Sequence, residues 1–150
     1  MKKTVKVGVV SAAYQVLNSA RYSKLTDSEK IALWKMLRSM KPVAVEFMDA
    51  TRDAEEKMKT SEDMDNRLLL ARKFENTQGK DSSMTAEEYF DFIAEYRRYR
   101  MTVDKLVREL SEKEVEIDFE PVNEETFRNL ISSNDWTMGQ VSVIGELITE

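Results

Sequence analysis

The chain has 150 residues, of which 41% are hydrophobic and 34% charged, so its size and composition are those of one globular domain. Histidine and cysteine are both absent. Their absence excludes histidine general bases, thiol nucleophiles, disulfides and zinc sites built from Cys and His. Four glycines and two prolines are too few for a turn-rich β-barrel, and the composition favours a mainly helical protein.

The net charge is 23 − 28 = −5, and much of the acidity lies in residues 112–125, which hold seven acidic residues and one lysine. General nucleic-acid binding needs a basic face, so we do not expect it. No apolar run reaches the roughly 18 residues of a membrane span, and Lys6 interrupts the apolar N-terminus. We therefore expect a cytoplasmic protein that does not enter a membrane.

The first predicted element is ambiguous. Val5, Val7 and Val9 alternate with other residues as in a strand, whereas Val7 and Val10 also start a helical stripe. The pattern leaves residues 3–9 open between strand and helix. From residue 11 to residue 22 the helical interpretation is favoured, because Ala and Leu are good helix formers.

A capping box, Thr26 followed three residues later by Glu29, predicts the start of a long amphipathic segment that continues to residue 58. Its apolar stripe begins with Ile31 and Trp34, and we expect Trp34 to anchor the core. Pro42 lies inside the segment. It lacks an N–H and crowds the preceding turn, so a kink or break is expected near residues 40–41.

In the middle of the chain the sequence predicts a short helix around residues 68–74 and a loop over residues 76–83. Thr85 and Glu88 form a second capping box, which opens a long helix over residues 86–113. Residues 114–120 then alternate strictly, with Val115, Ile117 and Phe119 on one face. This strand needs a partner, either residues 3–9 or a strand of another protein chain.

A helix beginning at residues 123–126, a polar turn that holds Trp136 and a closing amphipathic helix from Met138 complete the chain. No repeat or linker separates the elements. The sequence therefore predicts a single helical domain over residues 1–150, a mainly α bundle or hairpin with one long central helix and a short β element, which is a possible two-stranded ladder.

The layout resembles small, poorly characterised proteins of tailed-phage and prophage genomes, in which a helical body precedes a short acidic strand, a proline and a closing helix. The matching residues span most of the chain: Ala13, Val16, Leu17, Asn18, Leu37, Met40, Lys41, Pro42, Phe47, Glu88, Tyr89, Leu110, Val115, Glu116, Ile117, Pro121, Leu147 and Ile148. The resemblance implies a phage-associated protein, located in the host cytoplasm if phage-encoded. It implies no catalytic residues.

Two clusters on the long helix predict alternative chemistry. Glu88, Asp91 and Glu95 share one face at spacings of three and seven, as in all-helical nucleotide pyrophosphohydrolases that hold Mg²⁺ between acidic helices. The Arg and Tyr cluster could bind a nucleotide-type ligand, since arginine forks pair with phosphate and tyrosine stacks on bases. Its residues are Tyr96, Arg97, Arg98, Tyr99 and Arg100. Surface ion pairs and core packing are the simpler explanation of both clusters.

The favoured function is non-enzymatic: a phage- or prophage-associated accessory protein that acts by protein–protein contact, without a cofactor, and forms a homo-oligomer. Val115, Ile117, Phe119 and Trp136 are the candidate partner-binding residues, with solvated strand or core packing as the simpler explanation. The alternatives are a protein that sequesters a nucleotide-type signal through the Arg and Tyr cluster, and a Mg²⁺-dependent nucleotide pyrophosphohydrolase.

Overall fold

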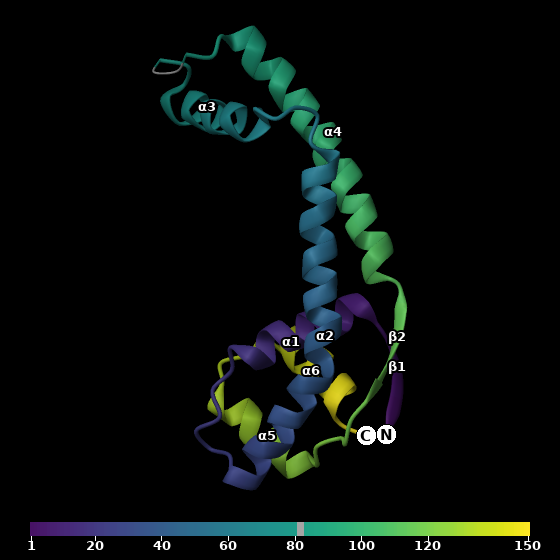
Figure 1. Ribbon diagram of the computed structural model, residues 1–150. Helices are drawn as coiled ribbons and strands as arrows, with labels where there is room; N and C mark the ends of the chain where they lie inside the picture. The colour runs from purple at the N-terminus through teal and green to yellow at the C-terminus, as the bar shows by residue number, and fades with distance from the viewer. Residues whose placement is uncertain (81–82) are drawn as a thin grey trace. The chain divides into compact units, whose positions relative to one another are not determined.

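A computed structural model describes residues 1–80 and 83–150. In these residues the chain forms six helices and one two-stranded antiparallel sheet, which confirms the predicted mainly α fold with a short β element (Figure 1). The chain divides into two compact units, the first formed by residues 1–50 and 109–150 and the second by residues 51–108. The prediction of a single domain over residues 1–150 stays a prediction.

The sheet of the first unit joins the N-terminal residues to the segment that follows α4. β1 (Lys2–Lys6) pairs with β2 (Glu114–Asp118) so that Val5 lies opposite Val115 and Lys6 opposite Glu114. Lys2 and Lys6 form salt bridges with Glu116 and Glu112 at 3.2 and 2.6 Å. The intrachain ladder predicted from the alternation is therefore present, and two of its three lysines pair with acids.

The ambiguity at residues 3–9 is resolved within the segment. The strand ends at Lys6, and α1 (Val7–Asn18) begins at the next residue. Val10, Ala13 and Leu17 of α1 are fully buried, and their helical spacing turns one face of the helix into the core. Gly8 is needed where α1 meets the end of α4 (Ala86–Ser111), because a Cβ there would lie 2.8 Å from Cβ of Ser111.

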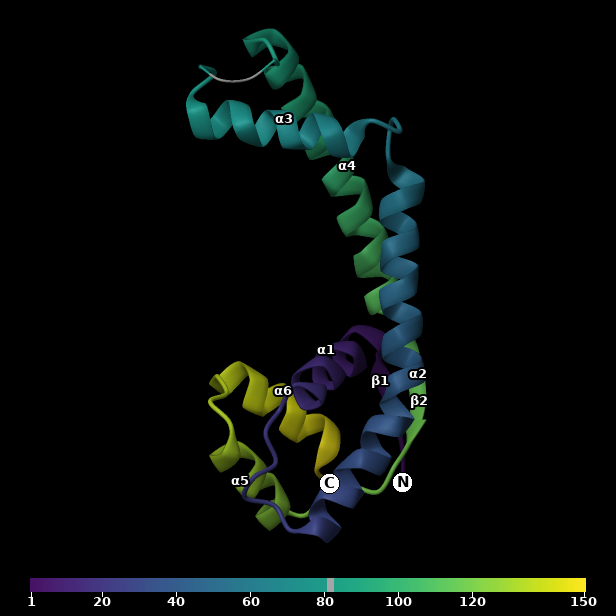
Figure 2. The ribbon, with the colours of Figure 1, turned by 60° about the vertical axis from the view of Figure 1, so that its left-hand side comes forward.

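α2 (Asp27–Met58) starts at the predicted capping box: Thr26 Oγ1 accepts from the Glu29 N–H at 3.2 Å, and Glu29 Oε1 accepts from the Thr26 N–H at 3.0 Å. The helix passes through Pro42 without interruption, so the predicted break is wrong. Met40 and Ala44 are fully buried on either side of Pro42, and their packing offsets the lost hydrogen bond. The ribbon changes direction in this first half of α2, as a kink would produce (Figure 2).

Two short helices close the first unit. α5 (Glu124–Ser133) is capped by Asn123, whose side chain accepts from the Thr126 N–H at 2.8 Å. α6 (Met138–Ile148) starts at a capping box formed by Thr137 and Gln140. At its other end Lys3 Nζ donates to the carbonyl oxygens of residues 146, 147 and 149, so β1 supplies the cation that satisfies the last turn of α6.

The second unit contains the last turns of α2, the helix α3 (Met64–Thr77) and most of α4 (Ala86–Ser111). Its core includes Phe92, Tyr99 and Val103. The predicted helix around residues 68–74 and the capping box at Thr85 are confirmed. The predicted loop starts later than expected, at Gln78, and its residues 81 and 82 lie outside the described part of the chain.

No described helix combines the length and the apolar character that crossing a bilayer requires.

Candidate partner-binding surface

The first half of α2 presents one face to the core and the other to solvent. The core face consists of side chains at helical spacing: Leu33, Met36, Met40 and Ala44. Residues one or two positions away from these are rotated by roughly 100° or 200° about the helix axis, and the outer face follows from that rotation. Ile31, Trp34, Arg38 and Val45 therefore project away from the core.

Large apolar side chains occupy this outer face. Ile31 is 54% exposed and Trp34 is 55% exposed. The prediction that Trp34 anchors the core is wrong, because the buried stripe runs through Leu33 and Met36 instead. Isolated exposed apolar residues are common on proteins, but a tryptophan and an isoleucine one turn apart form a patch that can be buried by a partner.

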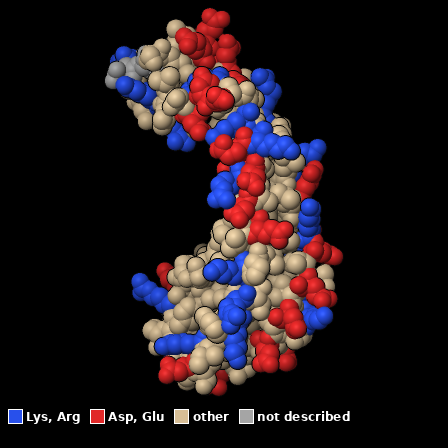
Figure 3. All heavy atoms as spheres, viewed as in Figure 1, with Lys and Arg blue, Asp and Glu red and all other residues tan. Residues whose placement is uncertain are grey.

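The same face is basic. Residues 30–45 contain four cations and no acidic residue, within a chain whose net charge is −5. The guanidinium of Arg38 lies over the Trp34 ring, 4.9 Å from its centroid. Figure 3 shows blue side chains in a row over the first part of α2. Within the described residues no carboxylate lies within salt-bridge distance of these cations, which are Lys30, Lys35, Arg38 and Lys41.

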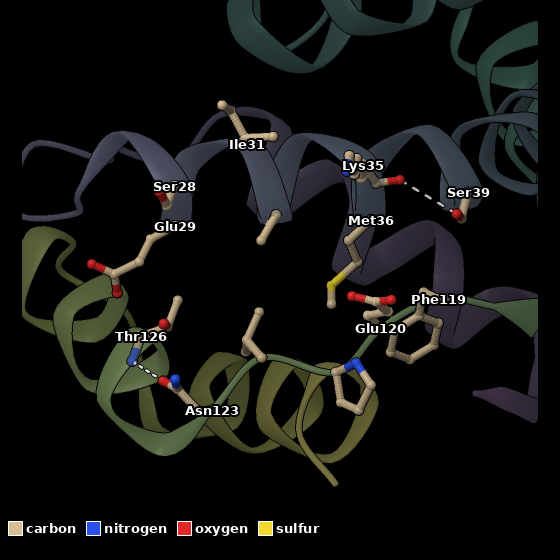
Figure 4. A pocket seen from close by; sticks show the side chains of 13 residues that line it. Ser28, Glu29, Ile31, Lys35, Met36, Ser39, Phe119, Glu120, Asn123 and Thr126 are labelled. Carbon is tan, nitrogen blue, oxygen red and sulfur yellow. Dashed lines mark hydrogen bonds between the residues drawn. The ribbon is translucent and has the colours of Figure 1, made fainter.

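A groove of about 510 Å³ borders this face, between the start of α2 and the segment that connects β2 to α5 (Figure 4). We call the outer face of residues 31–45 together with this groove the α2 surface. Ile31 projects outward at the rim of the groove, and Met36 points into it. The remaining lining is mixed: Ser28, Glu29, Ala32, Lys35, Ser39, Phe119, Glu120, Pro121, Val122, Asn123 and Thr126.

Helix caps hold the two walls of the groove in place. Glu29 belongs to the cap of α2, and the backbone N–H of Thr26 lowers the pKa of its carboxyl group. Asn123 and Thr126 belong to the cap of α5. The N–H of Val122 donates to the carbonyl of Ile148 at 2.9 Å, which fixes the connecting segment against α6. The groove is therefore a preformed feature of the first unit.

Three of the four residues predicted to bind a partner lie outside the α2 surface. Ile117 and Phe119 are buried, and Val115 and Trp136 pack against the same core. Because β1 already pairs with β2, these side chains face the chain's own interior, as the simpler explanation of the sequence had it. Phe119 alone reaches the groove wall. The sequence signal for the α2 surface is the basic, acid-free run over residues 30–45.

The Arg and Tyr cluster is only partly assembled. Tyr96, Tyr99 and Arg100 line a cleft of about 300 Å³ in the second unit, whereas Arg97 and Arg98 do not line it. Tyr99 donates to the carbonyl of Glu55 at 2.9 Å, and Arg100 pairs with Asp104 at 3.1 Å. The hydrogen bonds of Glu56 and Asp65 raise the pKa of the nearby Lys59. The cations of this cleft thus already have partners.

Two of the three acids predicted on α4 are also engaged. The Arg67 guanidinium binds Glu95 with two hydrogen bonds, at 2.8 and 3.1 Å, and lowers the pKa of that carboxyl group. Glu88 belongs to the capping box, and Asp91 is exposed. Within residues 1–80 and 83–150, no three acidic residues are placed to hold a metal ion.

Comparisons with protein-family models, with curated proteins and with solved structures found no match to this chain.

Proposed function

We propose that this protein is a non-enzymatic accessory protein, associated with a phage or prophage, that acts in the cytoplasm by binding another protein through the α2 surface. The phage association is supported by the resemblance in sequence pattern alone. The protein contact is supported by the structure of the first unit.

The observation that carries this proposal is the exposed patch of Trp34 and Ile31 beside a preformed groove. Protein interfaces are enriched in tryptophan and arginine, and their strongest contacts involve aromatic side chains that become fully desolvated on binding. Trp34 with Arg38 stacked on it supplies both residue types on one helix face. The α2 surface thus combines three features that can bind a partner protein: an apolar patch, neighbouring cations and a groove.

Site-specific photocrosslinking in the cells that express the chain tests the proposal. Trp34 is replaced by the photoreactive residue p-benzoylphenylalanine, which preserves an aromatic side chain on the α2 surface. We expect a discrete covalent adduct with one other protein after irradiation.

Phe90 of α4 provides the matched control, because it is an exposed aromatic residue (67%) outside the α2 surface. The same photoreactive replacement at Phe90 should not give that adduct. Equal adducts from both positions, or none from position 34, would contradict the proposal.

A second candidate is supported by the cleft of the second unit. Tyr96, Tyr99 and Arg100 do lie around one cavity, as sequestration of a nucleotide-type signal would require. A thermal shift with a panel of nucleotides, cyclic oligonucleotides included, tests it. Stabilisation that disappears in Arg100→Gln would support this candidate, and no stabilisation by any nucleotide would reject it.

The homo-oligomer is a further part of the proposal. It is supported by exposed apolar side chains outside the α2 surface, such as Met101 and Met138. Size-exclusion chromatography with light scattering should show a mass above 17.4 kDa at micromolar concentration. A monomer would remove the oligomer from the proposal without affecting the contact made by α2.

A further inference from the structure

We infer that the α2 surface is a docking site for an acidic, amphipathic α-helix of the partner protein. The inference rests on the proposed function and adds the secondary structure and the charge of the partner segment. Three features carry it: the spacing of the exposed side chains, the unpaired positive charge and the shape of the groove.

The exposed side chains repeat as they do where two helices pack side by side. From Ile31 the outer face continues at Trp34, Arg38, Val45 and Met48, which are steps of three, four, seven and three residues. Steps of three and four that sum to seven place side chains along one seam, which is the contact line of a neighbouring helix. An extended peptide would instead need an unpaired strand edge.

The positive charge along this seam indicates that the neighbouring helix carries acidic residues. The cations beside Trp34 are Lys35, Arg38 and Lys41, and none has a carboxylate partner among the described residues. Elsewhere in the first unit, Lys2, Lys6 and Arg128 form salt bridges with acids. A helix with Asp or Glu beside its apolar stripe would give these cations their counter-charges.

The groove accepts the side chains of such a helix. Ala32 and Met36 form its α2 wall, and Pro121 and Val122 form the opposite wall. A small residue leaves space for an incoming apolar side chain, and methionine adapts to its shape. This arrangement matches the mode in which an amphipathic helix lays its apolar face into a groove.

Other occupants of the surface fit less well. In a two-fold pairing with a second copy through the same face, the cations of each α2 would lie against those of the other. Phosphate groups of a nucleic acid or of anionic lipids would meet Glu29 and Glu120, the two acids that line the groove. Figure 3 shows red side chains near the row of blue ones in the lower part of the molecule. These acids repel a polyanion, whereas one helix can place its acids over the cations alone.

Binding of designed peptides to the full chain tests the inference. One fluorescent peptide is an amphipathic helix with Leu on one face and Glu beside it. A second carries Lys in place of Glu, and a third has the acidic composition in scrambled order. We expect the acidic helix to bind with a salt-sensitive Kd, and the other two to bind at least about tenfold more weakly, a difference of ~1.4 kcal/mol.

Matched variants locate the binding. Lys35→Glu with Arg38→Glu, and separately Trp34→Ala, should each raise the Kd of the acidic helix at least about tenfold. The control combines Lys24→Glu with Arg128→Glu, which makes the same change in charge at exposed residues of the first unit that do not line the groove. It should leave the Kd within about twofold, because exposed charges are screened by salt. Thermal unfolding by circular dichroism verifies that each variant is folded.

Each other outcome overturns the inference. Equal binding of the scrambled peptide would show that charge alone is recognised. Tighter binding of vesicles containing phosphatidylserine, or of a single-stranded oligonucleotide, would assign the surface to a polyanion. Self-association abolished by Trp34→Ala would assign it to a second copy. If crosslinking at position 34 captures a protein but no acidic helix binds, the proposed function stands and the partner chemistry is wrong. If crosslinking at position 34 captures no protein and no acidic helix binds, the proposed function fails as well.

Discussion

The α2 surface and the Arg and Tyr cluster of α4 look alike in the sequence, because both combine arginine with aromatic residues on a long helix. The structure separates them. Trp34 of α2 is half exposed, whereas Tyr99 of α4 is 8% exposed and bonded to the carbonyl of Glu55. Arg38 has an indole ring beneath it, and Arg100 has the carboxylates of Glu55 and Asp104. Two aromatic and basic motifs of similar sequence thus differ in whether their charge is paired within the chain.

The difference has a local cause. On α4 an acid lies one turn away from Arg100: Asp104 follows four residues later and pairs with it on the same helix. Residues 30–45 of α2 contain no acid at all. Lys35, Arg38 and Lys41 therefore have no acid three or four residues away on the helix. Substitutions in the two regions should therefore affect different properties: stability in α4, and binding in α2.

The largest effect on stability is expected from Tyr99→Ala. The ring belongs to the core of the second unit, where it contacts Tyr96 with the ring centroids 5.8 Å apart. Removing a buried aromatic side chain leaves a cavity, and we expect the free energy of unfolding to fall by about 3 kcal/mol. Urea denaturation followed by circular dichroism measures this change.

Tyr99→Phe is the matched control for that substitution. It keeps the ring and removes only the hydroxyl that donates to Glu55, so the loss should be about 1 kcal/mol. A loss below about 1 kcal/mol in Tyr99→Ala would contradict the structural role of the cluster and favour its role as a ligand site.

A smaller effect on stability is expected when the pH is lowered. Hydrogen bonds from Arg67, and then from Thr60, lower the pKa of Glu95 below its ordinary value of 4.5. Between the pKa of Glu95 in the folded chain and its pKa in the unfolded chain, the unfolded chain binds more protons than the folded one. The free energy of unfolding therefore rises with pH in that range. The contribution of Glu95 is present above pH 4.5 and is lost as the pH falls through its lowered pKa in the folded state. Denaturation midpoints between pH 6 and pH 3 should show this loss.

Glu95→Gln separates this effect from general acid denaturation. The variant should be less stable than the parent at pH 6, and its stability should fall less between pH 5 and pH 3. Asp91→Asn removes an exposed carboxylate of the same helix and should retain the pH dependence of the parent. If Glu95→Gln and the parent respond to acid equally, the pair with Arg67 does not stabilise the second unit.

Local sequence signals predicted the starts of the two long helices and one strand. Capping residues such as Thr26 and Thr85 predicted where α2 and α4 begin, since a side chain that accepts from the third N–H along favours a helix start. Strict alternation predicted β2 and its pairing with the N-terminal residues. These features are local or repeat with a short period, so a single sequence reveals them.

The inner face of α2 was not predictable in the same way. Ile31 and Trp34 fit a helical stripe as well as Leu33 and Met36 do, and the choice depends on which side packs against α1, α5 and α6. Pro42 likewise allowed two outcomes, and tertiary packing of Met40 and Ala44 decided between them. The position of the proposed site followed from this choice, because Ile31 and Trp34 are exposed while the partner-binding candidates of the sequence pack in the core.

The smallest effect on stability is expected from Trp34→Ala, although the same change should weaken partner binding most. Trp34 is 55% exposed, and the guanidinium of Arg38 stacks on its ring. An exposed cation–π contact contributes about 0.5 kcal/mol, and alanine recovers a similar amount through its higher helix propensity. The free energy of unfolding should therefore stay within about 0.5 kcal/mol of the parent. Trp136→Ala, which removes a half-buried indole from the core, should cost about 2 kcal/mol in the same urea titration. A loss at position 34 as large as that at position 136 would mean that Trp34 supports the fold, and the α2 surface would then resemble the cluster on α4 rather than differ from it.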